Sequence, residues 1–196
     1  MSKKNIRIRL NEAVDTSEKR NSLYFGGDFA LYSVDNDTTV DELFSDSVHK
    51  QIRESDVSVI NYEGVTAPEI INQTSNTGGL YIDEHCPSLL ADAGFTGVSL
   101  ANNHMYDYGP EGLIQTVQNC QDCELKTVGA GHSIEKAAVP ERFEFGELTV
   151  SVFAFSEHSY DQSIDIRDDS DPFISDVSHP KVMQKITEEK KKQISL

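Results

Sequence analysis

The sequence lacks a long apolar run. No stretch approaches the roughly 18 consecutive apolar residues of a membrane-spanning helix, and 37% of residues are hydrophobic. The first ten residues, Met1 to Leu10, include basic side chains but no apolar core of a secretory signal. These absences predict a chain without a transmembrane segment, and a cytoplasmic location is the default expectation.

Cysteine is also scarce. Cys86, Cys120 and Cys123 are an odd number of thiols, and without an export signal we expect them to be reduced. Cys120 and Cys123 have a C-x-x-C spacing, but a structural zinc site needs four ligands, usually from two such pairs. The sequence contains no second pair. We therefore interpret these residues as thiols near the end of a helix.

Basic residues are few in the middle of the chain. The net charge is -16, and residues 21–180 hold six of the 17 bases but 28 of the 33 acids. Such a surface repels polyanions, which argues against unaided nucleic-acid binding. It would attract metal cations, but for most of these acids the simpler interpretation is that they keep the protein in solution.

The length of 196 residues fits one domain with a sizeable core. Residues 1–21 form a basic segment. Ile6, Ile8 and Leu10 alternate with polar residues in it, so this segment could form an edge strand. Residues 22–196 form the domain. Its apolar runs alternate with segments in which apolar residues recur at helical spacing, and this alternation predicts a layered α/β fold.

The expected strands are short, and the expected helices are amphipathic. We predict strands at 23–29, 56–61, 95–100, 126–128, 139–145 and 148–155, the last two joined by a turn at Gly146 and Glu147. We predict helices at 40–55, 87–94, 112–123, 133–138 and 182–194. Residues 66–82 are expected to be a long loop beside the site.

Polar side chains follow three successive predicted strands. Asn102, Asn103 and His104 lie where the strand ending at Leu100 gives way to a helix opened by Gly109 and Pro110. Sheets of this kind place their sites at such strand ends. Carboxamides and an imidazole offer an oxygen ligand, a hydrogen-bond donor and a group that titrates near neutral pH. The alternative is a very polar turn.

The two earlier strands end in carboxylates. Asp28 closes the first strand, and Asn61 and Glu63, two residues apart, project to the same side at the end of the second. Asp28 alone could equally cap the next turn. Three consecutive polar strand ends are harder to explain as three turns, so we predict one shared site.

The wider pattern supports this interpretation. The stretches SLANNHMYDYGPEGLIQT, GAGHSIEKAAVP and VSVFAF resemble the CapA-type poly-gamma-glutamate capsule biosynthesis family, which is related to the calcineurin-like metallophosphoesterases. The resemblance runs from about Tyr24 to about Phe155, and Asn-Asn-His-x-x-Asp-Tyr-Gly is its most specific part. It implies a layered metallophosphoesterase-like sandwich. Members of the family are often tethered to a membrane.

The resemblance also implies roles for individual residues. Asp28 matches the first metal ligand, Glu63 a bridging carboxylate, Asn103 the asparagine ligand and His104 the catalytic histidine. Substrate binding is expected from Asn61, Asn102 and Asp107. The implied chemistry is metal-dependent hydrolysis of a phosphoester, and oxygen-rich ligation favours manganese or magnesium.

Two departures from the family pattern concern histidines. Ala30 stands where the related phosphatases have a histidine, and the later His-Trp-Gly-like segment has no counterpart, since the chain has no tryptophan. The resemblance thus implies a domain incomplete at its carboxyl end, with a poorly anchored last helix. We expect negligible phosphoesterase activity from residues 1–196 alone, and an open edge that invites a second chain or capsule-assembly proteins.

Three functions therefore remain open. The first is a metal-dependent hydrolase of a phosphoester or of capsule polymer. The second is a non-catalytic component of capsule assembly or export. The third is a truncated relic without hydrolase activity. Bound metal would favour the first.

Overall fold

The computed structural model describes residues 21–35, 37–71, 79–145, 148–156 and 171–194. The expectations for the basic segment before residue 21 and for the turn at Gly146 and Glu147 lie outside these residues. The same holds for positions 72–78 of the predicted loop.

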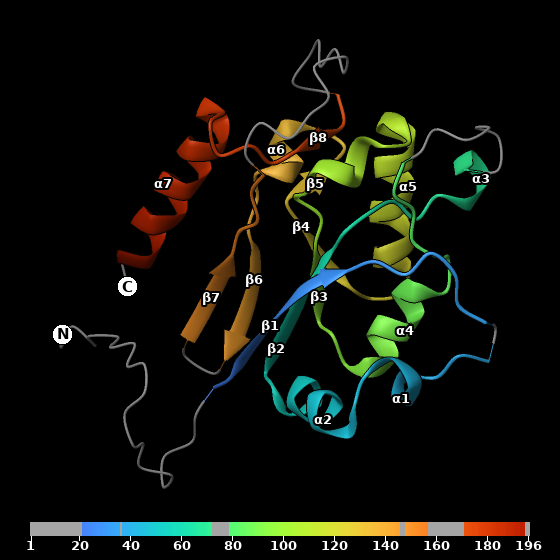
Figure 1. The fold of residues 1–196 in the computed structure, drawn as a ribbon. Coiled ribbons are helices and arrows are strands. Elements are labelled where there is room, and N and C mark those ends of the chain that lie inside the picture. The colour runs from blue at the N-terminus through green and yellow to red at the C-terminus, as the bar shows by residue number, and fades with distance from the viewer. Residues whose placement is uncertain (1–20, 36, 72–78, 146–147, 157–170, 195–196) are drawn as a thin grey trace, which may run out of the picture.

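A four-stranded parallel sheet forms the centre of the fold (Figure 1). Its strands lie in chain order: β1 (Leu23–Phe29), β2 (Val57–Tyr62), β3 (Gly97–Ser99) and β4 (Lys126–Val128). The sheet with its helices confirms the predicted α/β fold and is consistent with a metallophosphoesterase-like domain. Since all four strands are parallel, their carboxyl ends meet at one edge of the sheet.

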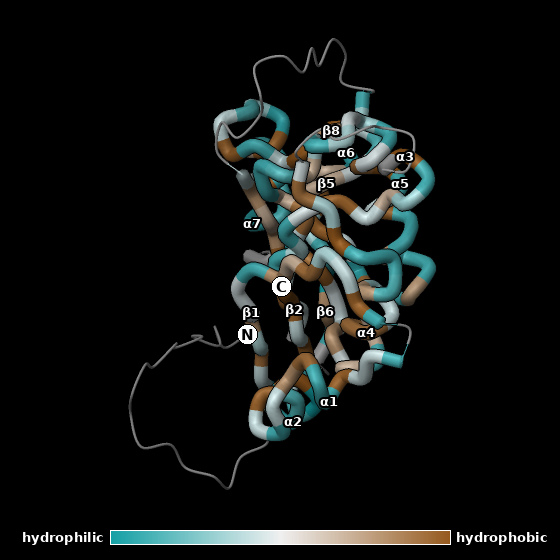
Figure 2. Tube along the Cα trace, turned by 45° about the vertical axis from the view of Figure 1, so that its right-hand side comes forward, coloured by the Kyte–Doolittle hydropathy of each residue, from teal (hydrophilic) through white to brown (hydrophobic). Residues whose placement is uncertain are grey.

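Helices cover one face of this sheet. They are α1 (Val40–Leu43), α2 (Asp46–Glu54), α3 (Pro68–Ile71), α4 (Cys86–Ala93) and α5 (Gly109–Asp122). Ile60 of β2 and Val98 of β3 are buried in one cluster with Leu90 of α4 and Leu113 of α5. Figure 2 shows hydrophobic and hydrophilic stretches interspersed along the chain, as expected where elements have one buried and one exposed side.

The prediction of one helix over residues 40–55 is wrong. Phe44 adopts an extended backbone (φ -126°, ψ 131°), and its ring packs against Phe95 with centroids 5.8 Å apart. Ser45, also extended, then precedes α2. The packing of the Phe44 ring on Phe95 outweighs continuation of the helix. The spacing of apolar residues alone did not predict this break.

An antiparallel hairpin covers the other face of the sheet. It consists of β6 (Glu141–Phe145) and β7 (Leu148–Val152). Phe143 and Val152 pack against Val57 and Val59 of β2. Leu23 and Phe25 of β1 pair in register with these two valines and so lie on the same face, yet they are 41% and 61% exposed. The hairpin therefore covers β2 but not β1.

The last helix, α7 (Pro180–Ile194), is firmly held, so the expectation of poor anchoring is wrong. Val182 is fully buried and packs with residues of α6 (Ile134–Ala137). Glu189 accepts hydrogen bonds from Nε of Arg142 and Oγ of Ser151, each at 2.8 Å. Two-residue strands that the sequence did not indicate, β5 (Ala130–Gly131) and β8 (Phe173–Ile174), pair beside α6. These contacts fasten α7 to α6 and to the β6–β7 hairpin.

None of the helices within the described ranges combines the length and apolar character that crossing a membrane requires.

Candidate functional site

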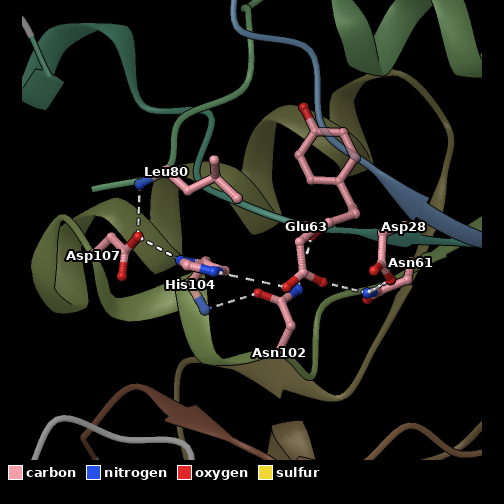
Figure 3. Close-up of polar contacts among 8 residues, drawn as sticks. Asp28, Asn61, Glu63, Leu80, Asn102, His104 and Asp107 are labelled. Atoms are coloured by element: carbon pink, nitrogen blue, oxygen red, sulfur yellow. Dashed lines mark hydrogen bonds and ion pairs between the residues drawn. The ribbon is translucent and has the colours of Figure 1, made fainter. Parts of the chain in front are cut away.

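The predicted polar strand ends form one connected cluster at the carboxyl edge of the sheet (Figure 3). We call it the polar network, and its members are joined by hydrogen bonds and one longer charge contact. They are Asp28, Asn61, Glu63, Asn102, His104 and Asp107.

A bulge in β1 places Asp28 in the network. Phe25 lies opposite Val59, but the register then shifts, so that Asp28 and not Gly27 lies opposite Asn61. One extra residue in a strand redirects the side chains that follow it. Gly26 allows the bulge to lie close to β2, because a Cβ at this position would lie 2.9 Å from Cγ1 of Ile60.

Asn61 joins the two carboxylates. Its Nδ2 donates to Oδ1 of Asp28 at 2.8 Å and also to Oε2 of Glu63. The amide orientation follows from this contact, since the reverse orientation would set an oxygen against two acceptor-only carboxylates. One neutral donor therefore links two like charges.

His104 is the second residue of the 3-10 helix η1 (Asn103–Tyr106). Its Nδ1 lies 2.8 Å from Oδ2 of Asp107, and the same oxygen accepts from the backbone N–H of Leu80 at 2.6 Å. Because a carboxylate only accepts, Nδ1 must carry a proton. Nε2 then faces Oε1 of Glu63 at 4.0 Å, beyond direct hydrogen-bond distance.

Asn102 is buried and links the segment that carries His104 to the end of β2. Its Oδ1 accepts from the backbone N–H of His104 at 3.1 Å, and its Nδ2 donates to the carbonyl of Tyr62 at 2.9 Å. Asn103, by contrast, is exposed and does not belong to the polar network. The family motif gave Asn103 and not Asn102 the ligand position, and no local pattern marked Asn102 as the buried one of the two.

Two tyrosines support the site as neutral side chains. Burial raises the pKa of Tyr62 and of Tyr106 well above the ordinary value for a tyrosine. Tyr62 shares a hydrogen bond with Thr66 Oγ1 at 2.5 Å, and Tyr106 donates to the carbonyl of Pro172 at 2.5 Å. Both hydroxyls therefore hold loops in place.

The Tyr62 carbonyl and the Leu80 N–H were missed at the sequence level, because backbone groups leave no residue signature.

A metal would find suitable chemistry here but no ready-made cluster. Carboxylate oxygens such as those of Asp28 and Glu63 are the ligands that magnesium and manganese prefer. Within the described residues, no group of three or more histidine, cysteine, aspartate or glutamate side chains is arranged to hold a metal ion. Asp28 and Glu63, which both accept a hydrogen bond from Asn61, are the candidate ligands.

The cysteines are not part of this site. All three are unpaired, and Cys86 and Cys120 are buried. Burial raises the pKa of the Cys86 thiol to about 12, so it stays protonated.

Fold and site together define an α/β protein with a polar cluster at the carboxyl edge of a parallel sheet. Over residues 12–195 the chain matches the family described as bacterial capsule synthesis protein PGA_cap, and it belongs to that family. This confirms the resemblance found in the sequence.

Two relatives show the same relationship. The chain is 40% identical to the capsule biosynthesis protein CapA of Bacillus anthracis over 52 residues, which are 26% of this chain and 13% of that protein. It is 29% identical to the PGA biosynthesis protein CapA of Bacillus subtilis strain 168 over 109 residues, which are 55% of this chain and 29% of that protein. The chain thus matches less than a third of the length of either relative.

Proposed function

We propose that this chain acts in poly-gamma-glutamate capsule biosynthesis through a divalent-metal-dependent hydrolase site of metallophosphoesterase type. The observation that carries the proposal is the geometry of His104, whose Nδ1 is held by Asp107 while its Nε2 faces Glu63. The name of the Bacillus subtilis relative supports the pathway.

Asp28 and Glu63 would hold the cation, which we expect to be manganese or magnesium. The cation would supply Lewis-acid polarisation of a phosphoryl oxygen and activation of water. Asn103 was expected to be a third ligand, and its exposed position beside His104 leaves that role as a proposal. Displacing the Asn61 amide from one carboxylate would free ligand oxygens.

His104 would act on the substrate through Nε2. With Nδ1 protonated and held by Asp107, Nε2 is the nitrogen left to exchange a proton at the open side of the site. With Nε2 also protonated, the imidazolium ring would stabilise charge on the phosphoryl group or donate the Nε2 proton to the leaving oxygen. Asp107, for which substrate binding was expected, has Oδ2 committed to His104 and Leu80, which favours an orienting role.

The test is hydrolysis of an activated phosphodiester with Mn²⁺. We expect turnover to depend on Mn²⁺ and to be lost in His104→Ala. His85→Ala is the matched control, because His85 is an exposed histidine paired with Asp83, outside the polar network. The assay is run in parallel on the 196-residue chain and on any longer product of the same reading frame. No turnover in any form, or equal measurable turnover with and without His104, would refute the proposal.

A non-catalytic role in capsule assembly is the second candidate. It is favoured by the Asn61 amide, which already donates to one oxygen of each carboxylate, Oδ1 of Asp28 and Oε2 of Glu63. In that case Asn61→Ala would destabilise the fold through unpaired like charges, and Mn²⁺ would have no effect on the melting temperature of the unmodified protein.

A further inference from the structure

We infer that Asn102 is a positioning residue that sets the separation between His104 and Glu63, an inference that rests on the proposed function of the site. Asn102 was expected to bind substrate. Its side chain instead joins the loop that carries His104 to the strand that leads into Glu63.

The Asn102 carboxamide is engaged at both ends. It is only 6% exposed, its oxygen accepts from the N–H of His104, and its nitrogen donates to the carbonyl of Tyr62. A buried amide with both ends paired is poorly placed to meet a substrate, and replacing it leaves two backbone groups without their partner.

The Tyr62 end of this link is rigid. Tyr62 is fully buried, its ring stacks on Phe29 with centroids 6.1 Å apart, and its backbone lies in β2. Glu63 is the next residue, and its N–H donates to the carbonyl of Phe29 at 2.9 Å. The backbone of His104 is therefore fixed relative to a core strand, whereas Asp107 fixes only the imidazole ring.

Asparagine has the right chemistry for both contacts. It precedes η1 as its N-cap, a position where serine serves equally well by accepting from a backbone N–H. Serine is too short to reach the Tyr62 carbonyl as well, and aspartate has no donor to offer it. Asn102→Ser therefore keeps the helix cap and removes the link. A residue that merely caps η1 would tolerate this change without effect.

The experiment measures how strongly Glu63 affects the His104 ring. The NMR signals of the imidazole C–H protons are recorded in the metal-free protein and in Glu63→Gln, and the shift between them reports the nearness of Glu63. The same pair is measured in the Asn102→Ser background and, as the matched control, in Asn103→Ser. Hydrogen exchange of the His104 amide shows whether the cap persists.

We expect the shift caused by Glu63→Gln to fall by at least about twofold in Asn102→Ser, as coupled sites should behave, and to be unchanged in Asn103→Ser. His104 amide exchange should stay within about threefold, because serine keeps the cap. An unchanged shift in Asn102→Ser would overturn the inference. Should that variant fail to fold, Asn102→Asp keeps the size and the acceptor and decides the question by the same criterion.

This measurement needs no metal. If Mn²⁺ fails to bind the unmodified protein, the proposed function fails, but the coupling between Asn102, Glu63 and His104 is still decided by the shifts.

Discussion

Nδ1 of His104 lies 2.8 Å from Oδ2 of Asp107, three residues further along the chain. The same carboxylate oxygen accepts from the N–H of Leu80, so the backbone at Leu80 is tied to the orientation of the imidazole. A histidine held in this way keeps its proton on Nδ1 and presents Nε2 outward.

Replacing Asp107 by asparagine should weaken this arrangement. The amide has one acceptor for two donors, and its NH₂ group can hold the other tautomer of His104. We expect the turnover that depends on His104 to fall about 10- to 100-fold, as for other groups that orient a reactive side chain, with the melting temperature little changed. Imidazole ¹⁵N shifts should show loss of the Nδ1–H form, and an unaltered tautomer would contradict this.

Gly129 should tolerate no side chain. Its φ is +91°, and a Cβ would lie 2.6 Å from Cβ of Ala101 and 2.9 Å from Cβ of Ala154. We expect Gly129→Ala to lower the free energy of unfolding by about 2 kcal/mol or more, through backbone strain and overpacking. Gly27→Ala is the control, since a Cβ at that position would have nothing within 4 Å and a change below about 0.5 kcal/mol is expected. Urea denaturation of both variants checks the difference.

The anchor of α7 should depend on pH. Hydrogen bonds from Arg142 lower the pKa of Glu189 to about 2, although burial opposes this, and its side chain is only 8% exposed. An unfolded glutamate titrates near about 4.3. Since the folded pKa is the lower one, the contribution to stability is complete above about pH 5 and is lost as the pH falls towards 2.

Glu189→Gln should therefore cost about 1–3 kcal/mol at pH 6, from the loss of charge-assisted hydrogen bonds. The difference from the unmodified protein should shrink as the pH falls towards 3. Glu188→Gln, one residue earlier and 41% exposed, should change the stability much less. Urea midpoints at both pH values test this, and a pH-independent difference would show that packing alone anchors the helix.

Local patterns were enough to predict the α/β class and most strands. Apolar runs mark β1 to β3, and Gly94 and Pro110 mark a helix end and a helix start as expected. Tertiary contacts decide the rest. The break at Phe44, the bulge before Asp28 and the pairing of β5 with β8 depend on partners distant in the chain.

For the site, too, the sequence predicted which residues take part but not their contacts. Asp28, Asn61, Glu63, Asn102, His104 and Asp107 were all singled out from strand-end positions or from the family motif, and the structure places them together. What each one contacts could not be predicted, because Asn102 and Asn103 are identical in type and adjacent. Only burial separates them. The apolar run of β1 likewise does not predict that Leu23 and Phe25 are exposed.

The most direct test of the proposed metal site is calorimetric titration of the purified protein with Mn²⁺. We expect saturable binding in the unmodified protein and none in Asp28→Asn, because this change removes one of the two carboxylates that Asn61 links. The melting temperature of Asp28→Asn should be close to that of the unmodified protein, since Asp28 is exposed and asparagine keeps the acceptor for the Asn61 amide. Equal Mn²⁺ affinity in the two proteins would contradict a metal-dependent site at this edge of the sheet.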